Sequence, residues 1–393
     1  MMYKVTSYRK LATLLLLNVG LMTILKPAMA GFSLQAAGPL TDQNTEIQVI
    51  DSTNRSSSVQ WVPDTKIKLA DFYQAKSLSF YIKAEDAQKS SLNIKLDCGR
   101  ECSGQLNIEP WLTVHSDTGW HHLSIPVNCF NHPEAQTDWP RPTLTFERIG
   151  NAKVFLKDIS MSEKVTTNYA CTEPELRAIT PAPLNTYWAK SWWKQRHQQK
   201  LLEKINIDPE LILIGDSITH GWERKGKAVW QHWFADIKTL NLGFSGDRTE
   251  NVLWRLQNGE VDGLNPELVV IMIGTNNTGH RMEAPEYIAK GIEQIVRELK
   301  KRLPESQILL LDIFPRGEEP NHAMRVNNAK TNARLNELGK KYDLLRANFN
   351  PAFLNNDQTL SKEIMPDWLH PNEKGYQIWA TKLAPYFKKY LAD

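Results

Sequence analysis

The sequence predicts two folded units, an all-β sandwich followed by an α/β domain with a parallel sheet. The length of 393 residues suits two domains of ordinary size. Short runs that alternate apolar and polar residues recur between 31 and about 163. From Asp208 onwards, apolar runs alternate with amphipathic stretches of helical period. The first pattern is typical of antiparallel strands, and the second indicates a parallel sheet covered by helices on both faces.

The first 30 residues have the features of a cleavable export signal. Three basic residues precede an apolar run that ends at Leu25, and Ala28-Met29-Ala30 supplies a small-x-small cleavage site. We therefore expect a secreted or periplasmic mature chain that begins at Gly31. An uncleaved membrane anchor is the alternative, but the run is shorter than the ~20 residues that span a bilayer. We expect no integral membrane span after cleavage.

The charge of the mature chain excludes one class of partner. The full chain has 47 basic and 44 acidic residues, and the first 30 residues hold four basic residues and no acidic one. The remainder therefore carries 43 basic against 44 acidic residues. A nearly neutral chain has no electrostatic basis for binding nucleic acid, so we expect no such partner.

All four cysteines lie in the first half of the chain, at Cys98, Cys102, Cys129 and Cys171. An even number of cysteines in an exported chain favours disulfides. Three pairings are possible, and we favour Cys98 with Cys102 and Cys129 with Cys171. A zinc site is the alternative, although only the first two cysteines have the close spacing of zinc ligands.

Four alternating runs support the sandwich, which we place at 31–163. They are 77–82, 91–96, 122–127 and 153–159. Glycine, proline, asparagine and aspartate separate them, as expected between short strands. Three prolines within 164–186 indicate a linker before the second unit.

The second unit, 187–393, has the alternation of a layered α/β domain. We predict strands at 211–214, 237–242, 268–273 and 308–313, with a weaker strand near Leu344. We predict helices at about 187–204, 226–234, 249–257, 284–302, 325–341 and 373–389. In the first of these helices we expect Trp188, Trp192, Trp193 and His197 to serve in packing.

Three of the predicted strands end in residues suited to acyl transfer. Ser217 follows the first strand in Gly-Asp-Ser, Gly243 follows Asn241-Leu242, and Asn276 lies in Gly-Thr-Asn-Asn. Ligands of open α/β sheets bind at the carboxyl ends of the strands, so Ser217 is a candidate nucleophile. The Gly243 amide and the Asn276 side chain are candidate donors to an oxyanion. Taken singly, each could instead be a turn or capping residue.

Asp367 and His370 precede the last predicted helix with a spacing of three residues. Imidazole is suited to deprotonating a serine near neutral pH, and a carboxylate can hold the required tautomer. Taken alone, Asp-x-x-His is also compatible with an ordinary surface loop. The joint occurrence with Ser217, Gly243 and Asn276 favours a catalytic interpretation.

These blocks resemble those of the SGNH (GDSL-type) hydrolases. The matching segments are Gly215-Asp216-Ser217, Asn241-Leu242-Gly243, Gly274-Thr275-Asn276 and Asp367-x-x-His370. Within the family, the runs 251–260, 274–277 and 315–318 look closest to the catalytic subunits of platelet-activating factor acetylhydrolase and their bacterial relatives. The resemblance covers about 187–393 and implies a flavodoxin-like three-layer α/β/α fold.

The resemblance also implies the role of each site residue. Ser217 would be the nucleophile, His370 the general base and Asp367 the residue that orients it. The backbone amides of Ser217 and Gly243 and the side chain of Asn276 would form the oxyanion hole. We expect neither a metal nor an organic cofactor.

The front unit more faintly resembles the galactose-binding-like modules of bacterial glycosidases. The resemblance rests on 97–102 and 119–130. We consider Trp61, Trp111 and Trp139 as sugar contacts and expect Trp120 to be buried. In the second unit, His220, His280, Arg248 and Arg316 are candidates for the pocket wall, whereas we expect His232 and His322 at the surface.

We therefore expect an exported serine esterase that removes acetyl or other short acyl groups from an acylated carbohydrate. Two alternatives stay open: a lipid or aryl-ester hydrolase, and a carbohydrate-binding protein with an inactive hydrolase domain. The acetylhydrolase subunits are cytosolic single domains, so the resemblance alone does not establish a phospholipid substrate. The sequence leaves the oligomeric state open.

Overall fold

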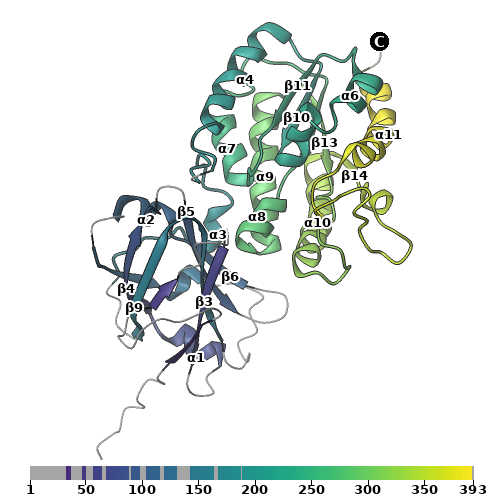
Figure 1. The fold of residues 1–393 in the computed structure, drawn as a ribbon. Coiled ribbons are helices and arrows are strands. Elements are labelled where there is room, and N and C mark those ends of the chain that lie inside the picture. The colour runs from purple at the N-terminus through teal and green to yellow at the C-terminus, as the bar shows by residue number, and fades with distance from the viewer. Residues whose placement is uncertain are drawn as a thin grey trace, which may run out of the picture.

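The computed structural model describes residues 32–36, 47–49, 56–63, 68–87, 90–97, 103–115, 119–130, 142–162, 167–186 and 188–391. Figure 1 shows the β unit and the α/β unit side by side, joined by the segment around α3 (Pro174–Arg177). Several expectations fall outside the described residues: the export signal, the pairing of Cys98 with Cys102, the side chain of Trp61, and Trp139.

The β unit consists of two antiparallel sheets that enclose one apolar core. In the described residues the strand orders are β1-β3-β8-β5-β6 and β2-β9-β4-β7. Phe80 and Phe146, one from each sheet, make an edge-to-face contact in the core with ring centroids 5.3 Å apart. The predicted sandwich is thus confirmed.

The strands of the first sheet are β1 (Phe32–Ala36), β3 (Ser56–Pro63), β5 (Ser90–Asp97), β6 (Ser103–Asn107) and β8 (Leu144–Gly150). Those of the second are β2 (Ile47–Val49), β4 (Ser77–Glu85), β7 (His121–Pro126) and β9 (Lys153–Ser162). The helical turns of this unit are α1 (Leu69–Gln74), α2 (Glu109–His115) and η2 (Val127–Phe130).

The segment 167–186 is attached to both units. The predicted disulfide between Cys129 and Cys171 is present and ties the start of the segment to the β unit. Towards its end, the backbone amide of Ala182 donates to the carbonyl of Glu250 at 3.1 Å. The side chain of Asn251 donates to the carbonyl of Ala182 at 2.9 Å. The segment therefore packs against the α/β unit instead of running free between the two.

The sheet of the α/β unit is parallel, with the strand order β11-β10-β12-β13-β14 among the described residues. Its strands are β10 (Leu211–Gly215), β11 (Thr239–Gly243), β12 (Leu268–Met272), β13 (Gln307–Leu311) and β14 (Leu345–Ala347). In chain order this is 2-1-3-4-5, the flavodoxin-like arrangement. The predicted fold class is confirmed.

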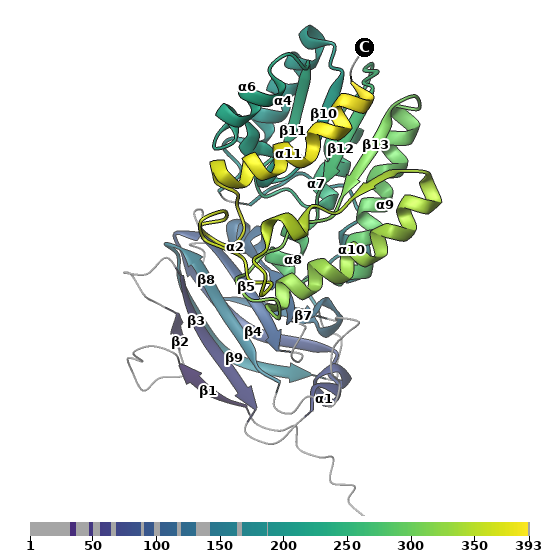
Figure 2. The ribbon, with the colours of Figure 1, turned by 90° about the vertical axis from the view of Figure 1, so that its right-hand side faces the viewer.

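Helices cover both faces of this sheet, which gives three layers (Figure 2). Successive side chains of a strand point to opposite faces. In β10, Ile212 and Ile214 pack with α7, α9 and α10, whereas Leu211 and Leu213 pack with α6 and α11. The longer helices are α4 (Trp193–Ile207), α6 (Lys227–Phe234), α7 (Thr249–Gln257), α9 (Pro285–Arg302), α10 (Ala323–Tyr342) and α11 (Glu373–Tyr390).

Two short helices of the α/β unit were not predicted, and both follow strands at the site edge. They are α5 (Ser217–His220) and α8 (Thr275–Arg281). The short 3-10 turns are η3 (Gly221–Glu223) and η4 (Asn350–Phe353). None of the helices in the described part of the chain is long and apolar enough to cross a bilayer.

The tryptophans differ in their exposure. Trp193 and His197 are buried, which confirms their expected packing role. Trp188 was also assigned to packing, but it stays 39% exposed beside the junction of the two units. Trp120 is only half-buried, with the Lys157 ammonium 4.4 Å from its ring centroid, so the expectation of burial was wrong for this residue.

Candidate active site

Three of the predicted site residues meet at the carboxyl edge of the parallel sheet. Ser217 begins α5 directly after β10, Gly243 ends β11, and Asn276 lies in the first turn of α8 after β12. The strand order reverses between β10 and β12, and this topological switch point is where open α/β sheets bind ligands.

Ser217, His370 and Asp367 form a hydrogen-bonded row. The Ser217 Oγ lies 2.8 Å from His370 Nε2, and His370 Nδ1 lies 2.7 Å from Asp367 Oδ2. Each distance is that of a good hydrogen bond. The serine and histidine come from positions 153 residues apart, so the fold itself assembles this row.

The turn that carries His370 also fixes its partner. Asp367 Oδ1 accepts the backbone amides of Leu369 at 3.1 Å and His370 at 2.7 Å. Burial raises the pKa of Asp367, but the hydrogen bonds from His370 and from Leu369 outweigh it and hold the pKa below its usual range. An ionised carboxylate therefore faces Nδ1, which favours the tautomer that leaves Nε2 free to accept from serine.

Trp368, between these two residues, has φ of +54°. This left-handed conformation is unfavourable for a bulky residue and is tolerated where the surrounding structure imposes it. The backbone amide of Gly317 donates to the carbonyl of Trp368 at 2.9 Å, and the Lys362 ammonium lies 4.1 Å from the ring centroid. These contacts hold the turn that presents His370.

Asn276 is buried, and its side-chain amide donates to the carbonyl of Asp247 at 3.0 Å. A primary amide has two hydrogens, so one remains for another acceptor. Gly274, two residues earlier, has φ of +127°, and a Cβ there would lie 2.7 Å from Ile313. A glycine is therefore needed to turn the chain from β12 into the helix that presents Asn276.

Gly243 has a packing role that the sequence did not reveal. A Cβ at this position would lie 2.2 Å from the backbone nitrogen of His220, so α5 can approach only a glycine. Its own N–H donates to Asn241 Oδ1 at 2.8 Å. The oxyanion role of Gly243 stays a prediction, and it requires this hydrogen bond to be exchanged for one to the substrate. No described residue accepts from the backbone amide of Ser217.

Asp216 supports the nucleophile from the preceding position. Its Oδ1 accepts the backbone amide of Ile218 at 3.0 Å and caps α5, and Tyr376 donates its hydroxyl to the carbonyl of Ile218 at 2.6 Å. Burial raises the pKa of Asp216 to about 7, although Arg316 and the capping hydrogen bond oppose the rise. The Gly-Asp-Ser block pointed to this position without indicating what the carboxyl does.

A buried ionic network is connected to Asn276 through Asp247. Arg255 is fully buried, with Nε 2.9 Å from Asp247 Oδ2 and Nη1 paired with Glu260. Trp193 Nε1 donates to Asp247 Oδ1 at 2.6 Å. Asp247 thereby has a fixed position, and its carbonyl is the acceptor that orients the Asn276 amide. Sequence spacing gave no sign of this arrangement.

A second serine–histidine contact lies on the same edge. His220 Nδ1 is 3.0 Å from Ser245 Oγ, and its Nε2 is 3.7 Å from Glu223. Burial, with Arg196 adding to the effect, lowers the pKa of His220 to about 4. Glu223 is itself engaged by Arg196 and Lys200. The Ser245–His220 contact can therefore be compared with the Ser217–His370 contact in the same molecule.

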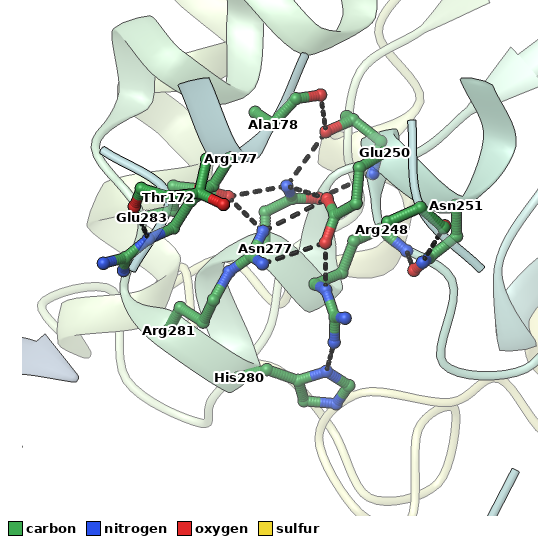
Figure 3. A network of polar contacts seen from close by, with 12 residues as sticks. Thr172, Arg177, Ala178, Arg248, Glu250, Asn251, Asn277, His280, Arg281 and Glu283 are labelled. Atoms are coloured by element: carbon green, nitrogen blue, oxygen red, sulfur yellow. Dashed lines mark hydrogen bonds and ion pairs between the residues drawn. The ribbon is translucent and has the colours of Figure 1, made fainter. Parts of the chain in front are cut away.

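The other residues predicted to line the pocket are His280, Arg248 and Arg316, and they lie at different positions around α8. His280 accepts at Nδ1 from Arg248 Nη1 at 3.1 Å, and Arg248 also contacts Glu250 at 2.6 Å (Figure 3). Arg316 donates to the carbonyl of Thr275 at 2.7 Å beneath the start of α8. His232 and His322 are exposed, as expected.

Comparison with known proteins identifies the class as an ester hydrolase. The model of the GDSL-like lipase/acylhydrolase family matches residues 213–378, and a galactose-binding domain-like model matches 65–161. The human platelet-activating factor acetylhydrolase IB subunit alpha1 is 33% identical over 205 residues, which cover 51% of this chain and 84% of that protein. The bovine alpha2 subunit is 35% identical over 185 residues, 47% of this chain and 78% of that protein.

Similar solved structures include a lipase and an esterase. A GDSL-like lipase from Bacteroides thetaiotaomicron has a TM-score of 0.42 and 20% identity, covering 49% of this chain and 97% of its own. An acetylxylan esterase from Geobacillus stearothermophilus has a TM-score of 0.39 and 20% identity, covering 48% and 97%. On the strength of its acetylhydrolase relatives, the chain belongs to the GDSL-like lipase/acylhydrolase family.

Proposed function

We propose that this protein is an exported serine esterase that removes acetyl or other short acyl groups from carbohydrate, with Ser217 as nucleophile. The hydrogen-bonded row of Ser217, His370 and Asp367 is the observation that carries the proposal. The basic and apolar start of the chain supports export.

In the first half of the reaction, Ser217 Oγ attacks the ester carbonyl while His370 Nε2 takes the hydroxyl proton. Asp367 keeps Nδ1–H in place and stabilises the imidazolium that forms. The tetrahedral intermediate then collapses, the bond to the alcohol oxygen breaks, and His370 returns the proton to that oxygen. The products of this half are a free sugar hydroxyl and an acyl-Ser217 ester.

In the second half, water replaces the alcohol. His370 accepts a proton from water as the resulting hydroxide adds to the acyl carbonyl. The second tetrahedral intermediate expels Ser217 Oγ, which regains the proton from His370. The acid product leaves and the enzyme returns to its starting state, with no redox change at any step.

The negative charge that develops on the carbonyl oxygen has to be stabilised by hydrogen-bond donors in both halves of the reaction. The backbone amide of Ser217 and the second amide hydrogen of Asn276 are free for this purpose among the described residues. Gly243 can add a third donor when its N–H leaves Asn241. Each such donor contributes on the order of 3 kcal/mol to stabilising the transition state.

Two observations support short acyl groups on carbohydrate. The relatives at 33–35% identity are acetylhydrolase subunits, which supports acetyl as the acyl group. The match of 65–161 to a galactose-binding domain-like model supports a sugar as the alcohol side of the ester. The same relatives favour a second candidate, the hydrolysis of an acetyl ester on a lipid.

Acetate release from acetylated xylan and from a short-chain aryl acetate tests the proposal. We expect the mature chain to release acetate from both substrates and Ser217→Ala to release it from neither. Ser245→Ala is the matched control, because it removes the other serine that contacts a histidine and should retain most activity.

The rival functions give different results in the same assay. Preference for acyl chains of eight or more carbons would favour a lipase. Release from the aryl ester and an acetylated lipid but not from xylan would favour the lipid candidate. Binding of polysaccharide without hydrolysis of any activated ester would favour a binding protein and contradict the proposal.

A further inference from the structure

A cavity of about 650 Å³ lies between the two units. Its size falls within the range of small-molecule binding sites. One wall is the face formed by β5, β6 and β8, a second is the segment 169–186, and the third is formed by Arg248 and 279–282 of the α/β unit. α8 contacts β6 directly, so the two units close the cavity together.

The wall from the β unit carries a chain of polar side chains. Asn107 donates to Asn93 at 2.9 Å, and Asn93 donates to Glu147 at 3.2 Å. Lys95 pairs with the same carboxylate at 2.8 Å, and Gln105 lines the cavity beside them. Amides and carboxylates arranged in this way offer both donors and acceptors, which suits ligand hydroxyl groups.

The opposite wall is rigid because its charges are interlinked. Figure 3 shows Glu250 at the centre of this group, with Arg248 and Arg281 directed towards it. Arg281 contacts both oxygens of Glu250, at 2.9 and 3.1 Å, and also Glu283 at 2.8 Å. His280 lines the same wall. Burial and the adjacent Arg248 lower the pKa of His280 to about 3, so its ring is neutral.

The charged side chains that line the cavity are, with one exception among the described residues, paired with opposite charges. Among the described residues, each charged lining side chain except Arg177 has an opposite charge within 4.0 Å. Arg177 instead donates to the carbonyls of Thr172 and Cys129, at 3.0 and 2.8 Å. Charges that already have partners suit an uncharged hydroxyl-rich ligand better than an ion. Trp188, partly exposed at the rim, adds an aromatic surface.

The cavity lies beside the catalytic edge. His280 follows Asn276 by four residues of α8, a rise of about 6 Å along the helix. Arg248 directly follows Asp247, whose carbonyl holds the Asn276 amide. The cavity wall at His280 and the predicted oxyanion donor Asn276 therefore belong to the same short helix.

We propose that this interdomain cavity binds neutral sugar units of the acylated glycan, so that the β unit forms part of the esterase's substrate site. The assignment rests on the proposed function and adds a location and a ligand class to it. It places glycan recognition on the β5-β6-β8 face and Trp188, away from Trp111, which does not line the cavity.

Calorimetric titration of the full chain carrying Ser217→Ala tests the cavity without turnover. The probes are xylopentaose, mannopentaose and a galacturonate pentamer. We expect a neutral pentasaccharide to bind, and Gln105→Ala to weaken its binding about tenfold through loss of a hydrogen-bonding group. Ala170→Trp places a bulky side chain at an exposed position of the cavity wall and should weaken binding at least as much. Gln60→Ala, an exposed glutamine on β3 of the same sheet, is the matched control and should bind as the parent does.

The outcomes separate this assignment from the proposed function. Three results would overturn the cavity assignment. They are the absence of binding by every probe, binding by Gln105→Ala and Ala170→Trp that is as strong as that of the parent, and binding of the galacturonate pentamer alone. Acetate release that depends on Ser217 would still support the esterase in each of those cases. Conversely, cavity-dependent binding without release from acetylated saccharides would uphold the glycan site and refute the carbohydrate esterase. Parent-like thermal unfolding of Gln105→Ala and Ala170→Trp establishes that the variants are folded.

Discussion

Asn276 presents one amide hydrogen to Asp247 and has a second available for the oxyanion. Asn276→Ala should therefore lower kcat for aryl acetate by roughly 10²–10³, with a much smaller change in KM. The neighbouring Asn277 is buried and bonds Thr249 and Glu283 instead. Asn277→Ala should lower the free energy of unfolding more than it lowers kcat. Unchanged turnover in Asn276→Ala would remove this residue from the site.

Asp216 makes stability depend on pH in an unusual direction. Its pKa is about 7 in the folded chain and about 3.8 in an unfolded one, so only the folded state holds the proton between these values. The free energy of unfolding should then fall as pH rises from 4 to 7, by at most about 1.4 kcal/mol per unit. Asp216→Asn removes this effect and keeps the cap on Ile218.

Urea unfolding of the wild type and Asp216→Asn at pH 5 and pH 8 measures the effect. We expect the variant to gain stability relative to the wild type at the higher pH. A difference that does not grow with pH would mean that Asp216 is ionised throughout, held by Arg316.

At the scale of elements, α7 is anchored by the Arg255 network. Arg255→Met would leave Asp247 and Glu260 buried without their cation and should lower the free energy of unfolding by about 3–5 kcal/mol. Arg302→Met removes a more exposed arginine that pairs with Asp262 and should cost less than about 1 kcal/mol. Urea unfolding of the two variants measures the contrast, and equal losses would contradict the structural role of the network.

The elements that the sequence predicted well are those with an apolar stripe. α7 was predicted at 249–257, its observed bounds, and α9 differs by one residue at its start. α8 was missed because residues 275–281 are polar throughout, and side-chain hydrogen bonds take the place of apolar packing. The helix α10 was predicted, but the hydrogen bonds of its buried asparagines were not. Asn327 donates to the carbonyl of Glu283, a partner that only the tertiary fold brings near.

At the scale of the whole molecule, the sequence predicted two units and the meeting of Ser217, Asn276, Asp367 and His370. Strand ends in a parallel sheet share one edge, so the closeness of Ser217 and Asn276 follows from the fold class, whereas Asp367 and His370 come from the turn before α11. The packing of Gly243 against His220 and its bond to Asn241 could not be predicted, because they depend on how closely α5 approaches β11. The cavity between the units likewise depends on surfaces that lie far apart in the sequence.

The disulfide between Cys129 and Cys171 closes a loop of 42 residues and ties one wall of the cavity to the β unit. Replacing both cysteines with serine should lower the free energy of unfolding by about 2–4 kcal/mol, because the unfolded chain gains freedom. It should also weaken pentasaccharide binding, since the wall at 169–172 is released. Ala170→Ser, next to the disulfide, is the control for urea unfolding and should change stability by less than about 0.5 kcal/mol. Equal stability of the double variant and the control would contradict the role of the bond.

The central claim is that Ser217 is the nucleophile. Its most direct test is to treat the full chain with a fluorophosphonate that reacts with activated serines, and to locate the adduct by peptide mass spectrometry. The account predicts one adduct, on Ser217, that forms much more slowly in His370→Ala. An adduct on Ser245 beside His220, or no adduct while ester hydrolysis persists, would contradict it.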